Sequence, residues 1–342
     1  MDENIQKCDS SKSYYIKEIE DEAHGKHNVF YVNKNISINK KMLKEMEKYN
    51  CKIVEFCDKF NKPIENLPSN IQNIVFGSNF NQRVDNLGGS LKNLTFGYWF
   101  NQPLCDNLPA GLLNLTFGDR FNQSLCDNLP SDIEYLTFGN NFNQHVDKLP
   151  SNLINLKFGH DFNQSLCDNL PSKTKYILFG NNFNHPVDNL PSGIEELYFG
   201  DNFNQSVDNL PDGIQTLYFG WNFNQSVDNL PSTLQKLSFG YKFNQSVDNL
   251  VKGLKELTIG GDEFNHPIDN LPSSIQKLVL GDEYNQPIQN NLPSELKILC
   301  FGEEFNQPIC DYIPQGLEEL YLSKNYNKSL NNLPASVRVI RI

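Results

Sequence analysis

Aspartate is the side chain with metal-binding or acid–base chemistry that recurs most regularly in this sequence of 342 residues. It occupies one position of a repeated pattern, at Asp85, Asp106, Asp127, Asp147, Asp168, Asp188, Asp208, Asp228, Asp248 and Asp269. If the repeats stack, these carboxylates form a ridge, and carboxylate oxygens are ligands for hard cations. Most of them precede Asn at a turn, where Asp characteristically binds nearby backbone N–H groups. The pattern therefore favours a turn-forming role over a cation site.

A second group with metal-binding chemistry consists of His24, His27, Cys51 and Cys57. The interval between the two cysteines is wider than in structural zinc sites, and both residues suit small core positions. We therefore predict no metal site. The eight cysteines of the chain show no paired framework, so we expect free thiols.

Sequence motifs of common enzyme classes are absent. There is no GxGxxG, no GxxxxGK[ST], no GxSxG and no HExxH. Because equivalent residues recur in every repeat, no unique cluster of acid, base and nucleophile stands out. We expect a protein that is not an enzyme, with no catalytic residues and no cofactor.

The elements that position these side chains follow an aromatic–Asn pair that recurs every 20 or 21 residues. Its aromatic members are Phe60, Phe80, Phe100, Phe121, Phe142, Phe162, Phe183, Phe203, Phe223, Phe243, Phe264, Tyr284, Phe305 and Tyr326. A constant period of this length indicates a solenoid in which each repeat is one coil of the chain. One coil cannot bury its own apolar side chains, so neighbouring coils must stack.

The coil from Ile194 to Pro211 illustrates the pattern. Leu197, Tyr198 and Phe199 alternate inward, outward and inward, as in a very short strand. Gly200 then lets the backbone turn sharply. Stacked strands of this kind form a continuous parallel sheet.

The Asn of each aromatic–Asn pair carries an amide with donors and an acceptor oxygen. In a stack, these amides can satisfy backbone groups of turns in their own and adjacent coils. We predict a structural ladder formed by Asn163, Asn184, Asn204, Asn224 and Asn244.

The recurring Phe-Asn-Gln or Phe-Asn-His, together with LPxx[LI]xxLxFG, resembles the FNIP repeat family. That family is a relative of leucine-rich repeats known chiefly from amoebae and the large DNA viruses that infect them. The resemblance covers residues 51–342 and implies a β-rich solenoid, a leucine-rich-repeat-like stack of about fourteen coils with one parallel sheet. Departures at Gly88, Gly89, Val251 and Thr174 concern local turns and one inward position. Some members resemble ubiquitin-ligase substrate receptors with an N-terminal F-box, a pattern absent here.

Residues 1–50 lack the repeat and are predicted to form a short α-containing N-terminal cap region, partly disordered, with about the first dozen residues mobile. A β-like run covers residues 28–33. Over residues 40–49, apolar residues including Met42 and Met46 recur at helical spacing, which predicts an amphipathic helix. Such an element covers the apolar cross-section of the first coil.

The outward strand positions are small and polar early in the array, aromatic in the middle and charged near the C-terminus. Tyrosine side chains are good interface anchors, so the aromatic stretch predicts a protein-binding patch. Its members are Tyr135, Tyr176, Leu178, Tyr198 and Tyr218, with Trp221 and Tyr241 just after strand-ending glycines. Favourable stacking between tyrosines of neighbouring strands is an equally supported alternative.

A formal net charge of −12 argues against nucleic acid or an anionic membrane as partner, since both require a basic face. The N-terminus lacks a secretory signal and no apolar run reaches the length of a membrane span, which favours a cytoplasmic protein. Near the C-terminus, Val337, Ile340 and Ile342 fit inward slots of a last edge strand. Arg338 and Arg341 either protect this edge from pairing with another chain, or the edge pairs with a second molecule in self-association.

The sequence therefore predicts a non-enzymatic scaffold that presents an extended solenoid surface to an unidentified protein partner. One alternative is a substrate-receptor subunit of a ubiquitin ligase, which the family resemblance suggests. The other is a structural or virion component.

Overall fold

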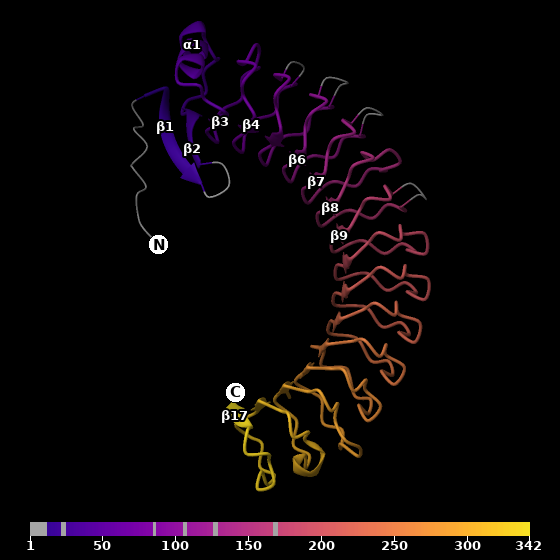
Figure 1. The fold of residues 1–342 in the computed structure, drawn as a ribbon. Coiled ribbons are helices and arrows are strands. Elements are labelled where there is room, and N and C mark those ends of the chain that lie inside the picture. Colours follow the sequence, from indigo (N-terminus) through magenta and orange to yellow (C-terminus); the bar gives the residue numbers. More distant parts are fainter. Residues whose placement is uncertain (1–11, 22–24, 85–86, 105–107, 126–128, 167–169) are drawn as a thin grey trace. The chain divides into compact units, whose positions relative to one another are not determined.

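A computed structural model describes residues 12–21, 25–84, 87–104, 108–125, 129–166 and 170–342. The chain forms two compact units, unit 1 (residues 1–160) and unit 2 (residues 161–342). Both are built of short coils that follow the period of 20 or 21 residues (Figure 1).

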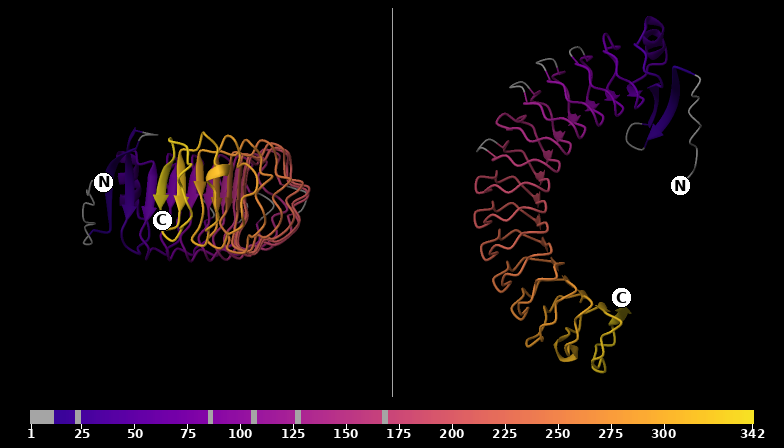
Figure 2. Two further views of the ribbon diagram at one scale, coloured as in Figure 1. Left: turned by 90° about the horizontal axis from the view of Figure 1, so that it is seen from below. Right: turned by 180° about the vertical axis from the view of Figure 1, so that it is seen from behind.

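Unit 1 begins with an antiparallel hairpin, after which each strand pairs in parallel with the next. The hairpin consists of β1 (Tyr14–Asp21) and β2 (Gly25–Val32), and helix α1 (Lys40–Lys48) follows it. The strands of the coils are β3 (Ile53–Phe56), β4 (Asn73–Val75), β5 (Asn93–Thr95), β6 (Asn114–Thr116), β7 (Tyr135–Thr137) and β8 (Asn155–Lys157). Figure 2 shows these strands along one side of the coils, with the turns on the other.

In unit 2 the strands pair in parallel in the order of the chain. They are β9 (Tyr176–Leu178), β10 (Glu196–Tyr198), β11 (Thr216–Tyr218), β12 (Lys236–Phe239), β13 (Glu256–Ile259), β14 (Lys277–Leu280), β15 (Ile298–Cys300), β16 (Glu319–Leu322) and β17 (Arg338–Arg341). A 3-10 helix, η1 (Cys310–Tyr312), replaces one turn. The predicted β-rich solenoid of stacked parallel strands is confirmed.

In-phase pairing turns each repeat position into a column of equivalent side chains. In unit 2, for example, Leu197 pairs with Leu217 on the neighbouring strand. The aromatic ring of the Phe–Asn pair is fully buried, and the Phe203 ring centroid lies 3.7 Å from that of Phe199 and 6.0 Å from that of Phe223. Stacked rings add to the stability gained from burial alone, which explains why an aromatic residue recurs at this position.

The N-terminal helix and one strand agree closely with the sequence-based expectation. Helix α1 begins after Asn39, whose side-chain Oδ1 accepts hydrogen bonds from the backbone N–H groups of Lys41 and Met42 at 3.0 and 3.1 Å. This N-cap satisfies backbone donors that have no partner within the helix. Met42 and Met46 are fully buried, as the helical spacing predicts. The β-like run of residues 28–33 corresponds to the second half of β2.

Strand β1 is an element that the sequence pattern does not predict. Its residues, YYIKEIED, show no one-sided apolar alternation. Ring stacking across the hairpin accompanies the pairing, with centroid distances of 5.1 Å between Tyr14 and Phe30 and 4.6 Å between Tyr15 and Tyr31. The segment expected to be mobile lies, up to residue 11, outside the described residues.

The glycine that follows most of the coil strands is required by close backbone contact. A Cβ built on Gly200 would lie 2.2 Å from the carbonyl oxygen of Gly180, and one on Gly220 would lie 2.4 Å from that of Gly200. Gly200 does not adopt the left-handed conformation that would itself call for glycine. The expected role in a sharp turn is therefore replaced by another, because adjacent coils meet backbone to backbone at this column.

The predicted asparagine ladder is confirmed. The Oδ1 atom of Asn204 accepts a hydrogen bond from the backbone N–H of Asn224 at 2.9 Å, and Asn224 Oδ1 accepts one from Asn244 at 2.9 Å. The same geometry links Asn184 to Asn163 at 3.1 Å. In unit 1 the corresponding contacts join Asn61, Asn81, Asn101, Asn122 and Asn143. In each of these coils, the asparagine ladder thus satisfies a backbone N–H group that lies outside the paired strands.

In unit 2, Asp188, Asp208, Asp228 and Asp248 accept hydrogen bonds from the next coil, and the last three also bind the serine two residues earlier in their own coil. Asp85, Asp106, Asp127 and Asp168 lie outside the described residues. In unit 2, Asn229 Nδ2 donates to Asp208 Oδ1 and Asn249 Nδ2 donates to Asp228 Oδ1, at 3.1 and 2.9 Å. The hydrogen bonds from Asn249 and Ser226 hold the pKa of Asp228 below its usual value. The carboxylates therefore bind the amide of the next coil, a contact that sequence adjacency within one coil does not reveal.

Tyr284 occupies the buried aromatic position that is Phe in most other coils, so its hydroxyl lies in an apolar environment. It is fully buried between the rings of Phe264 and Phe305, and its hydroxyl has no hydrogen-bond partner among the described residues. Burial raises the pKa of this phenol. Tyr326 occupies the equivalent position, but its hydroxyl donates to the carbonyl oxygen of Gln307 at 3.0 Å.

Replacing Tyr284 with Phe should therefore raise the free energy of unfolding by about 1 kcal/mol, because an unsatisfied buried hydroxyl is removed. Tyr326→Phe should lower it by a similar amount, because a hydrogen bond is lost. Urea denaturation of both variants measures the difference. Changes of the same sign in the two variants would contradict this assignment.

Candidate functional site

The outward face of the unit 2 sheet carries a short column of large side chains. Leu178, Tyr198 and Tyr218 occupy the third position of consecutive strands and lie in register. The Tyr198 and Tyr218 rings stack with centroids 4.9 Å apart. Tyr176, which lies at the first position of β9, reaches Tyr198 diagonally at 5.2 Å. We refer to Tyr176, Leu178, Tyr198 and Tyr218 as the tyrosine column.

A carboxylate fixes the orientation of the central ring. The Tyr198 hydroxyl donates to Glu196 Oε2 at 2.9 Å. Burial and this hydrogen bond raise the pKa of Tyr198 above its ordinary value. Tyr218 is 38% exposed and Tyr198 is half-buried. The column therefore presents ring surface in a defined orientation.

Trp221 and Tyr241 form a separate stack beyond the strands. Their ring centroids lie 4.6 Å apart, and the Trp221 side chain is 52% exposed. Asp262 raises the pKa of Tyr241 through its negative charge. The predicted patch thus contains two aromatic stacks in unit 2, one on the sheet face and one after the strand-ending glycines.

Tyr135 is not brought together with these residues within its own unit. It lies on β7 of unit 1, in register with Asn114 and Asn155, and its side chain is 46% exposed. Its neighbours on the sheet are amides rather than aromatic rings. The assignment of Tyr135 to the patch therefore stays a prediction.

Sequence reasoning overlooked an aromatic cluster in unit 1 formed by Tyr98, Trp99 and Arg120. The two rings meet edge to face at 5.0 Å, and the Arg120 guanidinium lies 5.0 Å from the Trp99 centroid and 5.5 Å from that of Tyr98. Tyr98 follows a strand-ending glycine, as do Trp221 and Tyr241. That shared position was the available signal.

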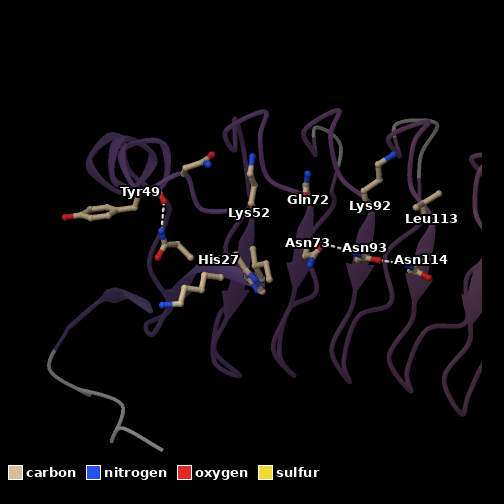
Figure 3. A pocket seen from close by; sticks show the side chains of 13 residues that line it. His27, Tyr49, Lys52, Gln72, Asn73, Lys92, Asn93, Leu113 and Asn114 are labelled. Carbon is tan, nitrogen blue, oxygen red and sulfur yellow. Dashed lines mark hydrogen bonds between the residues drawn. The ribbon is translucent and has the colours of Figure 1, made fainter. Parts of the chain in front are cut away.

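A groove runs along the strands of unit 1 (Figure 3). Its volume is about 690 Å³, and its wall is formed by β2, the end of α1 and the strands β3 to β6. One row of side chains consists of Lys52, Gln72, Lys92 and Leu113, and a second row consists of Asn73, Asn93 and Asn114. The remaining lining residues are Lys26, His27, Asn28, Tyr49, Asn50 and Ile53. The outward amides that the sequence shows as small polar positions thus line a cavity.

The two metal-binding hypotheses find no cluster in the part of the chain that the structure describes. Within those residues, no group of three or more His, Cys, Asp or Glu could hold a metal ion. Cys51 is buried and Cys57 is half-buried, both as free thiols, and burial raises the pKa of Cys51. His24 lies outside the described residues. The described residues also include no helix with the length and apolarity to cross a bilayer.

The two arginines of the last strand fold back onto their own unit. Arg338 forms an ion pair with Glu319. The Arg341 guanidinium donates to the carbonyl oxygens of Ser323 at 2.8 Å and Tyr326 at 3.2 Å. These contacts favour the interpretation that the arginines blunt the edge of β17.

Comparisons with known proteins agree with this architecture. The FNIP Repeat family profile matches residues 60–98, 83–120, 100–141, 121–148, 142–182, 183–209, 206–242, 243–282, 264–304 and 305–342. Among solved structures, the chain is similar to CroV588, a giant-virus protein described as a novel circular LRR protein, with 33% identity and a TM-score of 0.74. That match covers 92% of this chain, which spans 59% of the length of CroV588.

Two bacterial proteins of solved structure resemble the chain more remotely. YopM from Yersinia enterocolitica has 16% identity and a TM-score of 0.37, with 87% of this chain and 85% of YopM covered. InlJ from Listeria monocytogenes has 10% identity and a TM-score of 0.48, with 86% of this chain and 67% of the InlJ domain covered. No protein with a curated description matches the sequence. The ten matched repeats, spread from residue 60 to residue 342, show that the chain belongs to the FNIP repeat family.

Proposed function

We propose that this chain is a non-enzymatic scaffold that binds a protein partner through the sheet face of unit 2. The observation that carries the proposal is the tyrosine column, in which two ordered rings face outward. The coil does not need them, because its core and ladders use other positions. Leucine-rich-repeat solenoids commonly bind proteins through such extended surfaces.

Cross-strand stacking explains part of the column without any partner. A stacked aromatic pair contributes about 0.5–1.5 kcal/mol to stability, so the rings also support the sheet. The two interpretations differ in what a double truncation removes. Loss of stacking alone lowers stability and leaves binding unchanged, whereas loss of an interface anchor removes the partner.

The unit offers a matched control at Tyr321. Glu319-Leu320-Tyr321 repeats the Glu196-Leu197-Tyr198 sequence, and the Tyr321 hydroxyl likewise donates to its own glutamate, at 2.8 Å. Tyr321 lies in register with Cys300 and Ile340 rather than with another ring. Ile340 is thus in an outward position, and its expected inward position is wrong, because Val339 pairs with the buried Leu320. Tyr321→Ala therefore removes the same side chain and hydrogen bond from a place without aromatic neighbours.

Affinity capture from cells that make the protein tests the proposal. We expect Tyr198→Ala/Tyr218→Ala to reduce recovery of a specific partner by at least about tenfold, as loss of two anchors implies, while Tyr321→Ala recovers it normally. Identical partner lists for the wild type and the double variant would reject the tyrosine column as the binding site. Recovery of this chain alone would support self-association in its place.

A further inference from the structure

The groove of unit 1 differs in charge from the protein around it. The chain carries a net charge of −12, yet the groove is lined by Lys26, Lys52 and Lys92 and by no carboxylate among its 13 lining residues. Glu55, on the outward side of β3, does not line it, and burial raises the pKa of that carboxyl. A positive groove on a negative protein attracts ligands of negative charge.

The three lysines are not equally engaged. Lys26 lies 3.5 Å from Glu18, with both side chains largely exposed, and Lys92 Nζ donates to the carbonyl oxygen of Gly111 at 3.0 Å. The Lys52 ammonium makes no ion pair or hydrogen bond within the described part of the chain. An exposed ion pair contributes little, and the carbonyl contact leaves Lys92 with two N–H donors. All three lysines therefore retain donors for a ligand.

The amide row adds further donors. Asn114 Nδ2 donates to Asn93 Oδ1, and Asn93 Nδ2 donates to Asn73 Oδ1 at 2.6 Å (Figure 3). Each contact occupies an acceptor oxygen and uses only one of the two N–H groups of the donating amide. The row therefore offers spare N–H groups, while two of its three side-chain oxygens already have partners. These spare N–H groups suit a ligand that is rich in hydrogen-bond acceptors.

The dimensions fit an extended peptide. The groove runs from β2 to β6, and parallel strands lie about 4.8 Å apart, so four steps span about 19 Å. Six residues of extended chain cover about 20 Å. A peptide of this length can place its carboxylates against the row that contains Lys52 and Lys92, and its backbone carbonyls against the row of asparagines. A nucleic acid instead presents a dense, continuous series of phosphates that demands a larger basic face.

We propose that this groove binds an extended acidic peptide segment of a protein partner. Lys52 and Lys92 bind carboxylates of the segment, and Asn73, Asn93 and Asn114 donate to its backbone carbonyl oxygens. The site lies in unit 1, so it does not depend on the tyrosine column of unit 2.

Fluorescence anisotropy with synthetic probes tests this site in the full-length protein. The acidic probe is a labelled peptide of about eight residues that alternates Asp and Ser, long enough to fill the groove. The neutral probe replaces every Asp with Asn. A single-stranded oligonucleotide of equal charge is the third probe. We expect the acidic peptide to bind at low salt and to weaken as salt rises, and the other two to bind at least about tenfold more weakly.

Charge-matched variants locate the binding. Lys52→Gln/Lys92→Gln should weaken the acidic probe by about tenfold. Lys59→Gln/Lys62→Gln removes the same charge from unit 1 outside the groove and should bind as the wild type does. Lys52→Arg/Lys92→Arg, which keeps the charge, should retain binding. Equal affinity of the two Gln variants, equal binding of the neutral peptide, or tighter binding of the oligonucleotide would each overturn the proposal.

Discussion

Gly200→Ala should lower the free energy of unfolding by about 3 kcal/mol or more, the upper range for forced backbone shifts. The added methyl group would meet the carbonyl oxygen of Gly180 at 2.2 Å and the carbonyl carbon at 2.5 Å. These are backbone atoms that directly follow the paired strand β9, so they cannot rotate away as a flexible side chain would. The two coils must separate, and the Phe199 and Phe203 rings beside them must shift.

The control for this prediction lies in the same unit. A Cβ at Gly253 would lie 3.6 Å from the carbonyl oxygen of Ser232 and 3.8 Å from that of Leu234, which are ordinary contacts, and its φ is not left-handed. Gly253→Ala should therefore change stability by no more than about 1 kcal/mol, with stabilisation expected because Ala reduces the entropy of the unfolded chain. Denaturation in urea compares the two variants. A Gly200→Ala variant as stable as Gly253→Ala would refute the close-contact role.

Asn224→Leu should lower the free energy of unfolding by about 2–4 kcal/mol. Asn224 Oδ1 accepts two hydrogen bonds, from the Asn244 backbone N–H at 2.9 Å and from Gln245 Nε2 at 2.9 Å. Leucine accepts neither, so the half-buried backbone donor of Asn244 loses its partner. Gln245 keeps a weaker contact to the Asn224 carbonyl oxygen at 3.3 Å, which limits the loss on that side.

Asn224→Asp separates the acceptor role from the presence of an amide. The carboxylate keeps an oxygen where the two donors converge, so this variant should lose less than about 1 kcal/mol at neutral pH. In thermal unfolding, we expect the melting temperature to fall in the order wild type, Asn224→Asp, Asn224→Leu. An unchanged melting temperature for Asn224→Leu would remove the ladder from the account.

The period alone predicted the columns, because in-phase stacking follows once every coil has the same length. The burial of Phe203, the inward Leu197 and the acceptor role of Asn224 all follow from this rule. Contacts between coils were harder to predict, because the sequence of one repeat shows only which residues are neighbours within that coil. The bond from Asn249 to Asp228 and the approach of Gly200 to Gly180 are of this kind.

The candidate sites were predictable only in part for a related reason. The outward position of Tyr198 follows from strand alternation, but its diagonal contact with Tyr176 depends on which of two outward positions each ring occupies. One wall of the unit 1 groove is formed by the start of β2, where Lys26 and His27 precede the β-like run that the sequence predicts. Lys52 and Lys92 belong to different repeats, and only stacking places them along one wall.

Site-specific photo-crosslinking tests the central claim most directly, namely that the sheet face of unit 2 binds a protein partner. A photoreactive phenylalanine analogue is placed at position 218, on the sheet face, or at position 226, an exposed serine outside the strand of the same coil. We predict that irradiation in the native cell links position 218, and not position 226, to a protein other than this chain. Crosslinks from position 226 alone, or the same products from both positions, would contradict the account.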